Sequence, residues 1–204
     1  MPLKYQVPDD KKVRVIVDSD AACEADDPFA IAHALLCDKF IVKAVFAEHF
    51  NCEGSTKQSF EEIQRVVKAM KKEVPVLMGE IGKMSEKGTG EISEASSFLI
   101  REALREDDKP LYVLCIGAIT NIASAIQMCP DIVPRMTVVW IGGQSHEHST
   151  SEVREFNAGN DIEAANLVLG SGVRFWQIPN DVYGSMHISL AEIQMRIAPC
   201  GEIG

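Results

Sequence analysis

Four aspartates between positions 18 and 27 have the types and spacing of a divalent-cation site. Asp18 and Asp20 stand two residues apart at the end of a short apolar run, and Asp26 and Asp27 follow after five further residues. Crowded carboxylates raise one another's pKa unless a cation neutralises them. Sites built from oxygen ligands favour calcium or magnesium over zinc. The spacing therefore predicts a cation site, although the proline after Asp27 also fits a helix that has this aspartate as its N-cap.

Two later segments carry polar residues that could complete such a site. Thr120 opens a helical pattern after an apolar run, so it could cap the helix or offer its backbone carbonyl to a cation. Glu155 and Asn157 flank a phenylalanine and could hydrogen-bond a sugar. The His-Glu-His stretch at 146–148 lacks a third metal ligand at a recognisable spacing. The glycines at 142–143 do not form a phosphate-binding motif, so no nucleotide-phosphate cradle is expected.

A scaffold must bring these separate segments together, and the rest of the chain has the pattern of one. Short apolar runs rich in β-branched residues predict strands at 13–18, 40–47, 74–79, 110–117, 136–143 and 173–179. Helical patterns lie at 26–38, 56–72, 94–105, 120–128, 161–169 and 189–197. This alternation predicts an α/β fold with an open, mostly parallel sheet and helices on both faces. Ligands of such sheets bind at the carboxyl ends of the strands, where the polar segments fall.

Composition narrows the class of protein further. The chain has 204 residues, 46% of them hydrophobic and 25% charged, which predicts a single domain over 1–204. The formal net charge of -10, without a Lys/Arg cluster, argues against a nucleic-acid partner. Six cysteines without a C-x-x-C pair predict reduced thiols and a cytoplasmic protein. We expect neither a signal peptide nor a membrane span, because no apolar run is long enough.

The three polar segments together resemble the nucleoside hydrolase superfamily, the inosine–uridine-preferring kind and its relatives. The aspartates are similar to the family's D-x-D-x-x-x-D-D motif, residues 119–121 to its Leu-Thr-Asn turn, and residues 155–157 to its Glu-Phe-Asn segment. The likeness runs over residues 13–179 in the same order. It implies a Rossmann-like architecture and calcium-dependent hydrolysis of the N-glycosidic bond of a ribonucleoside or related N-riboside. The products would be ribose and the free base.

The resemblance also implies the cation ligands. Carried over by position, Ca²⁺ would be held by Asp20, Asp27 and the Thr120 carbonyl, with Asp18 supporting the cluster. Asp20 would also be the catalytic residue, because a carboxylate beside the attacking water can accept its proton. The calcium ion would orient that water and lower its pKa.

The substrate-binding residues follow from the same resemblance. Asp26 and Asn157 would hydrogen-bond the ribose hydroxyls, and Glu155 would reach the 5′-hydroxyl. The family's early asparagine corresponds to His49 or Asn51, and the residues do not decide between them. Anchoring the hydroxyls would convert binding into placement of the reacting carbon. We expect a small-molecule substrate and a homo-oligomer, as is common in the family.

Two departures from the family keep alternatives open. The aspartate motif is two residues longer than the common form, and the chain ends before the family's fourth aspartate ligand and proposed histidine proton donor. Asp181 and His187 are weak substitutes. We therefore expect a domain incomplete at its C-terminus, an unusually short homologue or a degenerate protein. The alternative functions are a non-catalytic calcium- and sugar-binding relic, or a haloacid-dehalogenase-type magnesium phosphatase with Asp18 as nucleophile and Asp20 as acid/base.

Overall fold

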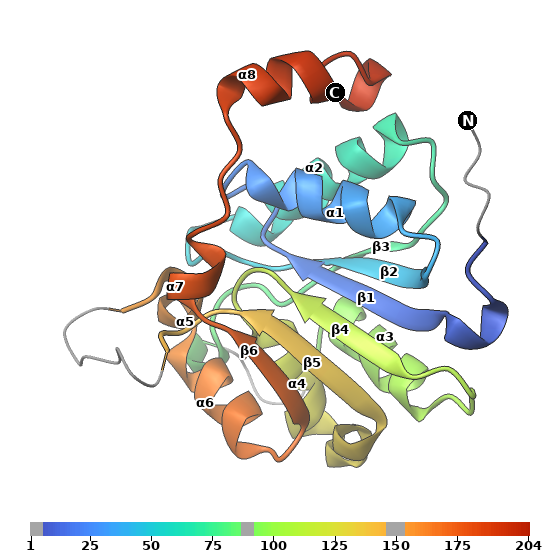
Figure 1. The fold of residues 1–204 in the computed structure, drawn as a ribbon. Coiled ribbons are helices and arrows are strands. Elements are labelled where there is room, and N and C mark those ends of the chain that lie inside the picture. The colour runs from blue at the N-terminus through green and yellow to red at the C-terminus, as the bar shows by residue number, and fades with distance from the viewer. Residues whose placement is uncertain (1–5, 87–91, 146–153) are drawn as a thin grey trace.

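A six-stranded sheet forms the centre of the computed structural model, which describes residues 6–86, 92–145 and 154–204. Every pair of neighbouring strands is parallel, in the order β3-β2-β1-β4-β5-β6 (Figure 1). The strands are β1 (Val13–Ser19), β2 (Phe40–Ala47), β3 (Val76–Met78), β4 (Leu111–Cys115), β5 (Met136–Ile141) and β6 (Arg174–Ile178). The predicted α/β class with a parallel sheet is confirmed.

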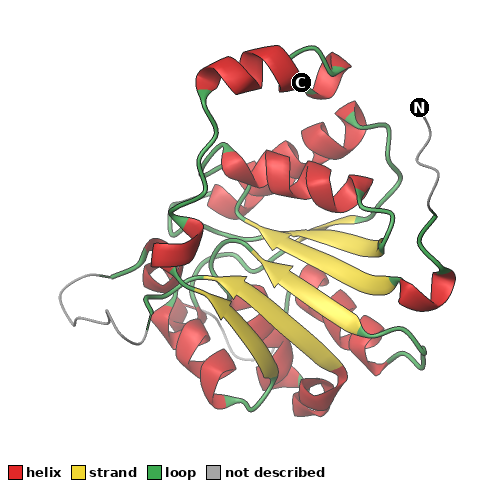
Figure 2. Ribbon diagram, in the orientation of Figure 1, coloured by secondary structure: helices red, strands yellow, loops and turns green. Residues whose placement is uncertain are grey.

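Helices cover both faces of the sheet (Figure 2). One face carries α1 (Asp26–Leu36) and α2 (Ser55–Ala69), and the other carries α3 (Glu94–Leu104), α4 (Thr120–Met128) and α6 (Ile162–Gly170). Two short helices, α5 (Phe156–Asn160) and α7 (Asn180–Tyr183), lie near the carboxyl ends of the strands (Figure 1). The 3₁₀ turns are Asp9–Lys11, Met84–Glu86, Pro130–Arg135 and Gly201–Ile203.

Successive side chains of a strand pack into two separate apolar cores, one on each face of the sheet. The strand sequences are therefore continuous hydrophobic runs. Val15 and Val17 of β1 pack with Ile31 and Ile63 beneath α1 and α2. Ile16 points the other way, into the core beneath α3, α4 and α6. Full burial of each such side chain contributes about 1.5–3 kcal/mol, so the two cores fix the orientation of β1 and of the aspartates that follow it.

The strand order creates one crevice that matters for function. From β1 the chain proceeds outward to β2 and β3, and then returns to place β4 on the other side of β1. Open α/β sheets bind ligands at such a switch point, outside the carboxyl ends of the strands. The turns after β1 and β4 therefore meet here, and they carry the predicted aspartates and Thr120.

Several details differ from the sequence predictions. The helix predicted at 189–197 is a three-residue α8 (Leu190–Glu192) that continues as a π-helical turn, Ile193–Ile197. Helix α1 begins at Asp26 with Ala25 at its N-cap, so the prediction of an Asp27 cap is wrong. Helix α4 has Ile119 at its N-cap, so Thr120 does not cap it either. Both polar side chains bind partners outside their own helices instead, as described below.

Other sequence predictions concern the thiols and the membrane. All six cysteines are free thiols, as expected. In the described part of the chain, no helix has both the length and the apolar character needed to cross a bilayer. The His-Glu-His stretch at 146–148 lies outside the described residues.

Candidate active site

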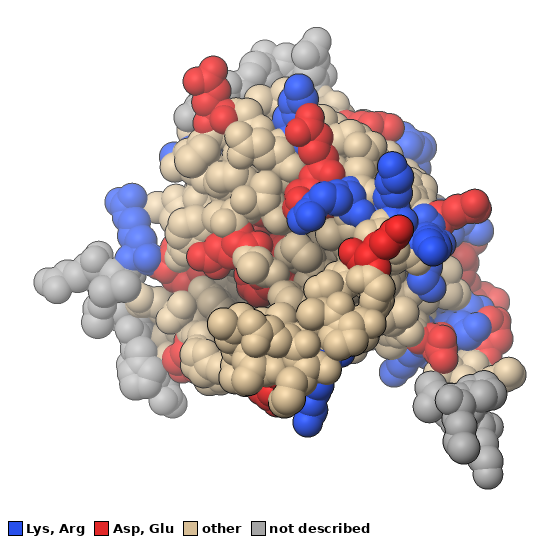
Figure 3. Space-filling view, turned by 90° about the horizontal axis from the view of Figure 1, so that it is seen from above, with Lys and Arg blue, Asp and Glu red and all other residues tan. Residues whose placement is uncertain are grey.

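The carboxyl ends of β1 and β4 border a small cavity of about 50 Å³ that is lined by four of the predicted site residues. Asp20, Asp26 and Asp27 line it together with Asn157, which comes from helix α5. In the space-filling view, acidic side chains gather beside a hollow of the surface (Figure 3). The structure thus brings together residues that are more than a hundred positions apart in the chain.

Asp20 is held against the turn that follows β4. It is 3% exposed, and a Cβ at Gly117 would lie only 2.6 Å from its Oδ1 atom. Only glycine permits this close approach of the backbone to the carboxylate. Since Thr120 follows Gly117 by three residues, the turn that carries the predicted carbonyl ligand runs directly beside Asp20.

Asp27 reaches the same cavity from the first turn of α1. Its Oδ1 accepts a hydrogen bond of 2.5 Å from the Ser19 hydroxyl at the end of β1. This bond replaces the expected capping role and ties the helix to the strand that carries Asp20. The helix N-terminus also favours a negative charge at this position.

In the described part of the chain, no ion pair joins Asp20 or Asp27 to a positively charged side chain. Burial raises the pKa of Asp20 to about 8, and the neighbouring Asp27 adds to the shift. Burial likewise raises the pKa of Asp27 to about 7, although the Ser19 bond opposes the effect. A bound cation would remove this electrostatic penalty, so the residues fit a cation site.

The protein side chains near the cavity do not complete a metal site alone. Within residues 6–86, 92–145 and 154–204, no group of three or more His, Cys, Asp or Glu side chains could hold a metal ion. A cation held by Asp20 and Asp27 would need further ligands, and backbone carbonyls and water are oxygen ligands of the kind that calcium and magnesium accept.

A buried hydrogen-bond network around Asn121 supports the aspartate cluster. Asn121 donates from Nδ2 to Asp18 Oδ1 at 2.8 Å and from its backbone N–H to Glu48 Oε2 at 3.0 Å. It also accepts from the Glu80 N–H at 2.7 Å. Burial raises the pKa of Asp18 to about 7 and that of Glu48 well above its usual range. Asp18 is 0% exposed, so it lies beneath the cavity rather than in its lining.

Thr120 is held by a second chain of hydrogen bonds. The backbone N–H of Asn51 donates to His49 Nδ1 at 3.2 Å, which leaves the proton on Nε2. His49 Nε2 then donates to the Thr120 hydroxyl at 2.8 Å, and that hydroxyl donates to Asp161 Oδ2 at 2.8 Å. Asp161 also caps α6 through the Ala164 N–H. The chain fixes the turn beside Asp20.

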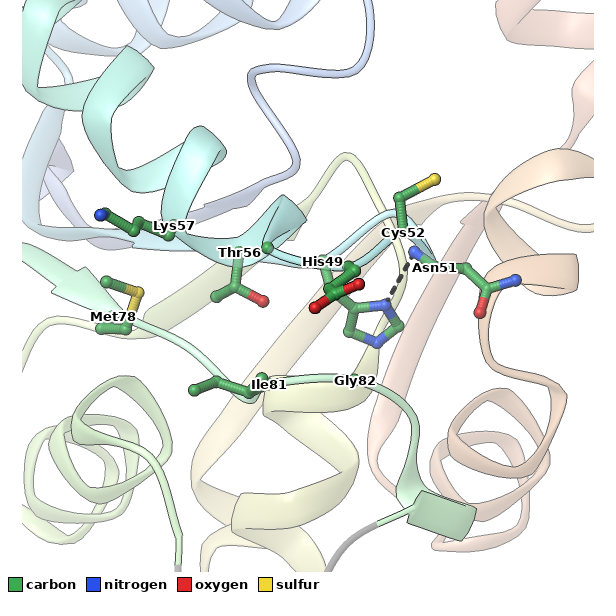
Figure 4. Close-up of a pocket in the computed structure, with 10 residues that line it drawn as sticks. His49, Asn51, Cys52, Thr56, Lys57, Met78, Ile81 and Gly82 are labelled. Carbon is green, nitrogen blue, oxygen red and sulfur yellow. Dashed lines mark hydrogen bonds between the residues drawn. The ribbon is translucent and has the colours of Figure 1, made fainter.

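His49 and Asn51 do not line the cavity of the aspartates. They border a larger cavity of about 530 Å³ at the ends of β2 and β3, together with residues at the start of α2 (Figure 4). In Figure 4 the His49 ring lies near Gly82, with the Asn51 N–H directed at it. His49 is 1% exposed, and its ring belongs to the hydrogen-bond chain that holds Thr120.

Glu155 lies at the N-cap of α5 and accepts from the backbone N–H groups of Asn157 and Ala158. Asn157 is buried beside it and donates from Nδ2 to the Ile141 carbonyl at 2.8 Å. These bonds aim the segment at the cavity that holds Asp20. Asn157 lines the cavity together with the aspartates, and Glu155 holds the start of the helix that carries Asn157.

Some residues of the site could not be found from the sequence. Tyr183 lines the aspartate cavity, and its hydroxyl donates a hydrogen bond to Glu155. The two weak candidates from the sequence, Asp181 and His187, are exposed. Glu48 and Asp161 are buried in the supporting networks. The only sequence signal for Asp161 was an acidic residue before the 161–169 helical pattern, and Glu48 and Tyr183 had none.

Comparisons with known proteins identify one family. The family profile described as inosine-uridine preferring nucleoside hydrolase matches residues 15–200. The non-specific ribonucleoside hydrolase RihC of Escherichia fergusonii is 35% identical over 91 residues, which cover 44% of this chain and 30% of that protein. An uncharacterised Schizosaccharomyces pombe protein is 31% identical over 113 residues, covering 54% of this chain and 36% of its own length. In these matches the chain spans about a third of its relatives' length.

A solved structure shows the same fold. The purine-preferring ribonucleoside hydrolase of Gardnerella vaginalis superposes with a TM-score of 0.68 at 22% identity. The superposition covers 89% of this chain and 65% of that one. Because the family profile matches nearly the whole chain and the fold agrees, this chain belongs to the inosine-uridine preferring nucleoside hydrolase family.

Proposed function

We propose that the chain hydrolyses the N-glycosidic bond of a ribonucleoside, or a related N-riboside, in a calcium-dependent reaction that releases ribose and the free base. The observation that carries the proposal is the pair of buried carboxylates, Asp20 and Asp27, in one cavity with Asp26 and Asn157. Family membership and the ribonucleoside hydrolase activity named for the bacterial relative support the substrate class.

Asp20 is the residue that acts on the nucleophile. Cleavage passes through an oxocarbenium-like ribose, as in other glycoside hydrolysis, and a water must attack the anomeric carbon. The buried carboxylate of Asp20 accepts the proton of that water. A bound calcium ion would supply the positive charge that keeps Asp20 and Asp27 ionised and that acidifies nearby water.

Asp26 and Asn157 bind the ribose hydroxyls from two sides of the cavity. Glu155, at the N-cap of α5, is the residue that we propose for recognition of the 5′-hydroxyl. Holding the sugar at several hydroxyls places its anomeric carbon against the attacking water, which accounts for much of the rate enhancement available to such a site. Nδ2 of Asn157 donates one of its protons to the Ile141 carbonyl, which holds the side chain beside the cavity that it lines.

The phosphatase alternative has less support. Its nucleophile would be Asp18, but this side chain is 0% exposed and accepts a hydrogen bond from Asn121. A phosphoryl group could not reach it without a rearrangement of the strand ends. The structure therefore favours the hydrolase over the phosphatase.

We further propose that the chain works in the cytoplasm as a homo-oligomer. The six free thiols fit a reducing compartment. Strands β4 to β6 leave an apolar groove of about 330 Å³ on the side of α1 and α2, which includes Tyr112, Leu114, Val139 and Trp176. Exposed apolar surface of this kind favours self-association, which sedimentation velocity at several protein concentrations would reveal.

Hydrolysis of a panel of ribonucleosides in calcium chloride tests the proposed activity. Chromatography should detect ribose and free base in equal amounts, and Asp20→Asn should abolish the products. Asp38→Asn is the matched control, because Asp38 is exposed at the far end of α1. Calcium binding without any ribose release would instead support the sugar-binding relic.

A further inference from the structure

The carboxylate of Glu155 has no acceptor position left for a ligand in this structure. Oε2 accepts from the N–H groups of Gly143 at 2.6 Å and Ala158 at 2.9 Å. Oε1 accepts from the Asn157 N–H at 2.9 Å and from the Tyr183 hydroxyl at 2.6 Å. A carboxylate offers about four lone-pair sites, so these four donors fill it.

Three of the four donors are fixed, and one is exchangeable. The N–H groups of Gly143, Asn157 and Ala158 belong to the backbone of the β5 end and of α5, whose positions follow from the fold. The fourth donor is a side chain on the four-residue helix α7, which is partly exposed. A ligand hydroxyl can therefore bind Glu155 only where the Tyr183 hydroxyl now lies.

Tyr183 also belongs to the cavity in which the ligand would bind. It lines the same cavity as Asp20, Asp27 and Asn157. The Asn180 side chain donates to its hydroxyl at 3.0 Å, which turns the phenol proton toward Glu155. Burial and the adjacent Glu155 raise the pKa of Tyr183 to about 12, so the phenol stays a neutral donor.

We propose that the Tyr183 hydroxyl occupies the position on Glu155 that the primary 5′-hydroxyl of the substrate takes, and that the ligand displaces it. The inference rests on the proposed function, in which Glu155 recognises this hydroxyl. Tyr183 is then a specificity residue that competes with the substrate at one atom. A protein that must first give up an internal contact binds its ligand more weakly by the corresponding factor.

Removal of the Tyr183 hydroxyl should change ligand affinity in the opposite direction from removal of a residue that only supports the fold. Removal of the Tyr183 hydroxyl should strengthen binding of ligands that carry the 5′-hydroxyl, because nothing has to be displaced. Ligands without this hydroxyl never compete with Tyr183, so their affinity should not change. A residue that merely stabilises the fold would weaken the binding of both kinds of ligand.

Calorimetric titration in calcium chloride distinguishes these cases. The probes are methyl β-D-ribofuranoside, whose methoxy group leaves poorly, and its 5-deoxy analogue. Tyr183→Phe should bind the 5-hydroxyl probe about tenfold more tightly than the wild type, the factor expected for a hydrogen bond to a charged group. The 5-deoxy probe should bind equally to both proteins. Tyr112→Phe, the same change in the distant apolar groove, should alter neither affinity.

Asn180→Leu provides a second variant that keeps the tyrosine. It removes the amide that orients the phenol, so it should strengthen binding of the 5-hydroxyl probe by a smaller factor. Equal changes for both probes, no change, or weaker binding of the 5-hydroxyl probe would overturn the inference. If ribose is still released from nucleosides in that case, the proposed function stands. If neither probe binds and no nucleoside is hydrolysed, the proposed function fails together with the inference.

Discussion

The metal-free protein should lose stability as the pH rises from 5 to 8, and calcium should oppose this loss. Burial raises the pKa of Asp20 to about 8 and that of Asp27 to about 7, whereas an unfolded aspartate has a pKa of about 3.9. Between these values the folded chain holds protons that the unfolded chain has already released. The contribution of these two carboxyl groups to stability is therefore fully present below pH 4. It decreases as the pH rises toward their pKa values in the folded state.

The size of the effect follows from proton linkage. Each proton held only by the folded state changes the free energy of unfolding by about 1.4 kcal/mol per pH unit. Counting Asp20 alone, the loss between pH 5 and pH 8 is about 4 kcal/mol, and Asp27 adds to it below its own pKa. Calcium at a hundred times its dissociation constant should restore about 2.7 kcal/mol at pH 8. At pH 5 it should restore little, because protonated carboxyl groups bind calcium poorly.

Urea unfolding followed by circular dichroism measures this directly, in EDTA and in calcium chloride, at four pH values. Asp20→Asn should flatten the pH dependence in EDTA and remove the calcium effect, while Asp38→Asn, at an exposed position, should behave as the wild type. The reasoning would be refuted if the free energy of unfolding of the wild type rose from pH 5 to pH 8 in EDTA. It would also be refuted if calcium did not change this free energy at pH 8.

Substitutions at three further positions test how the site is held. Gly117→Ala should weaken calcium binding roughly ten- to a hundredfold in calorimetry, because the new Cβ would displace the Asp20 carboxylate; unchanged affinity would contradict the close approach. Asn121→Ala should lower the free energy of unfolding in urea by about 3 kcal/mol, because it leaves several buried groups unpaired, and a loss near zero would contradict the network. Thr120→Val should cost about 2 kcal/mol by the same assay, whereas Thr120→Ser keeps the hydroxyl bonded to His49 and should cost much less.

The sheet could be predicted from the sequence because its central strands, such as β1, are buried on both faces. Each strand is a short run of β-branched and apolar residues, and helical patterns separate the runs, so few other arrangements are possible. The predicted bounds of β2 and α4 are those of the structure. Helices α5 and α7 were missed because five or four residues are too few to show a helical period.

The aspartates of the site could also be predicted from the sequence. The strand that ends at Ser19 and the helix that starts at Asp26 are close in the chain, so the position of Asp20 and Asp27 follows from local geometry. The cap predictions for Asp27 and Thr120 were wrong because tertiary partners, Ser19 and Asp161, bind these side chains instead.

Long-range hydrogen bonds account for what the sequence could not reveal. Asn121 and Asp18 are 103 positions apart, and Tyr183 and Glu155 are 28 positions apart. No spacing rule connects such pairs, because their contact depends on which strands become neighbours in the sheet. The full occupation of the Glu155 carboxylate follows only from the folded positions of its four donors.

The most direct test of the central claim is the rate of ribose release from a nucleoside by chelated protein to which calcium is added back. The account predicts a saturable return of hydrolysis in the wild type and in Asp38→Asn, and none in Asp20→Asn. Hydrolysis that persists in Asp20→Asn, or that does not depend on the added calcium, would contradict the assignment of this cavity as a calcium-dependent active site.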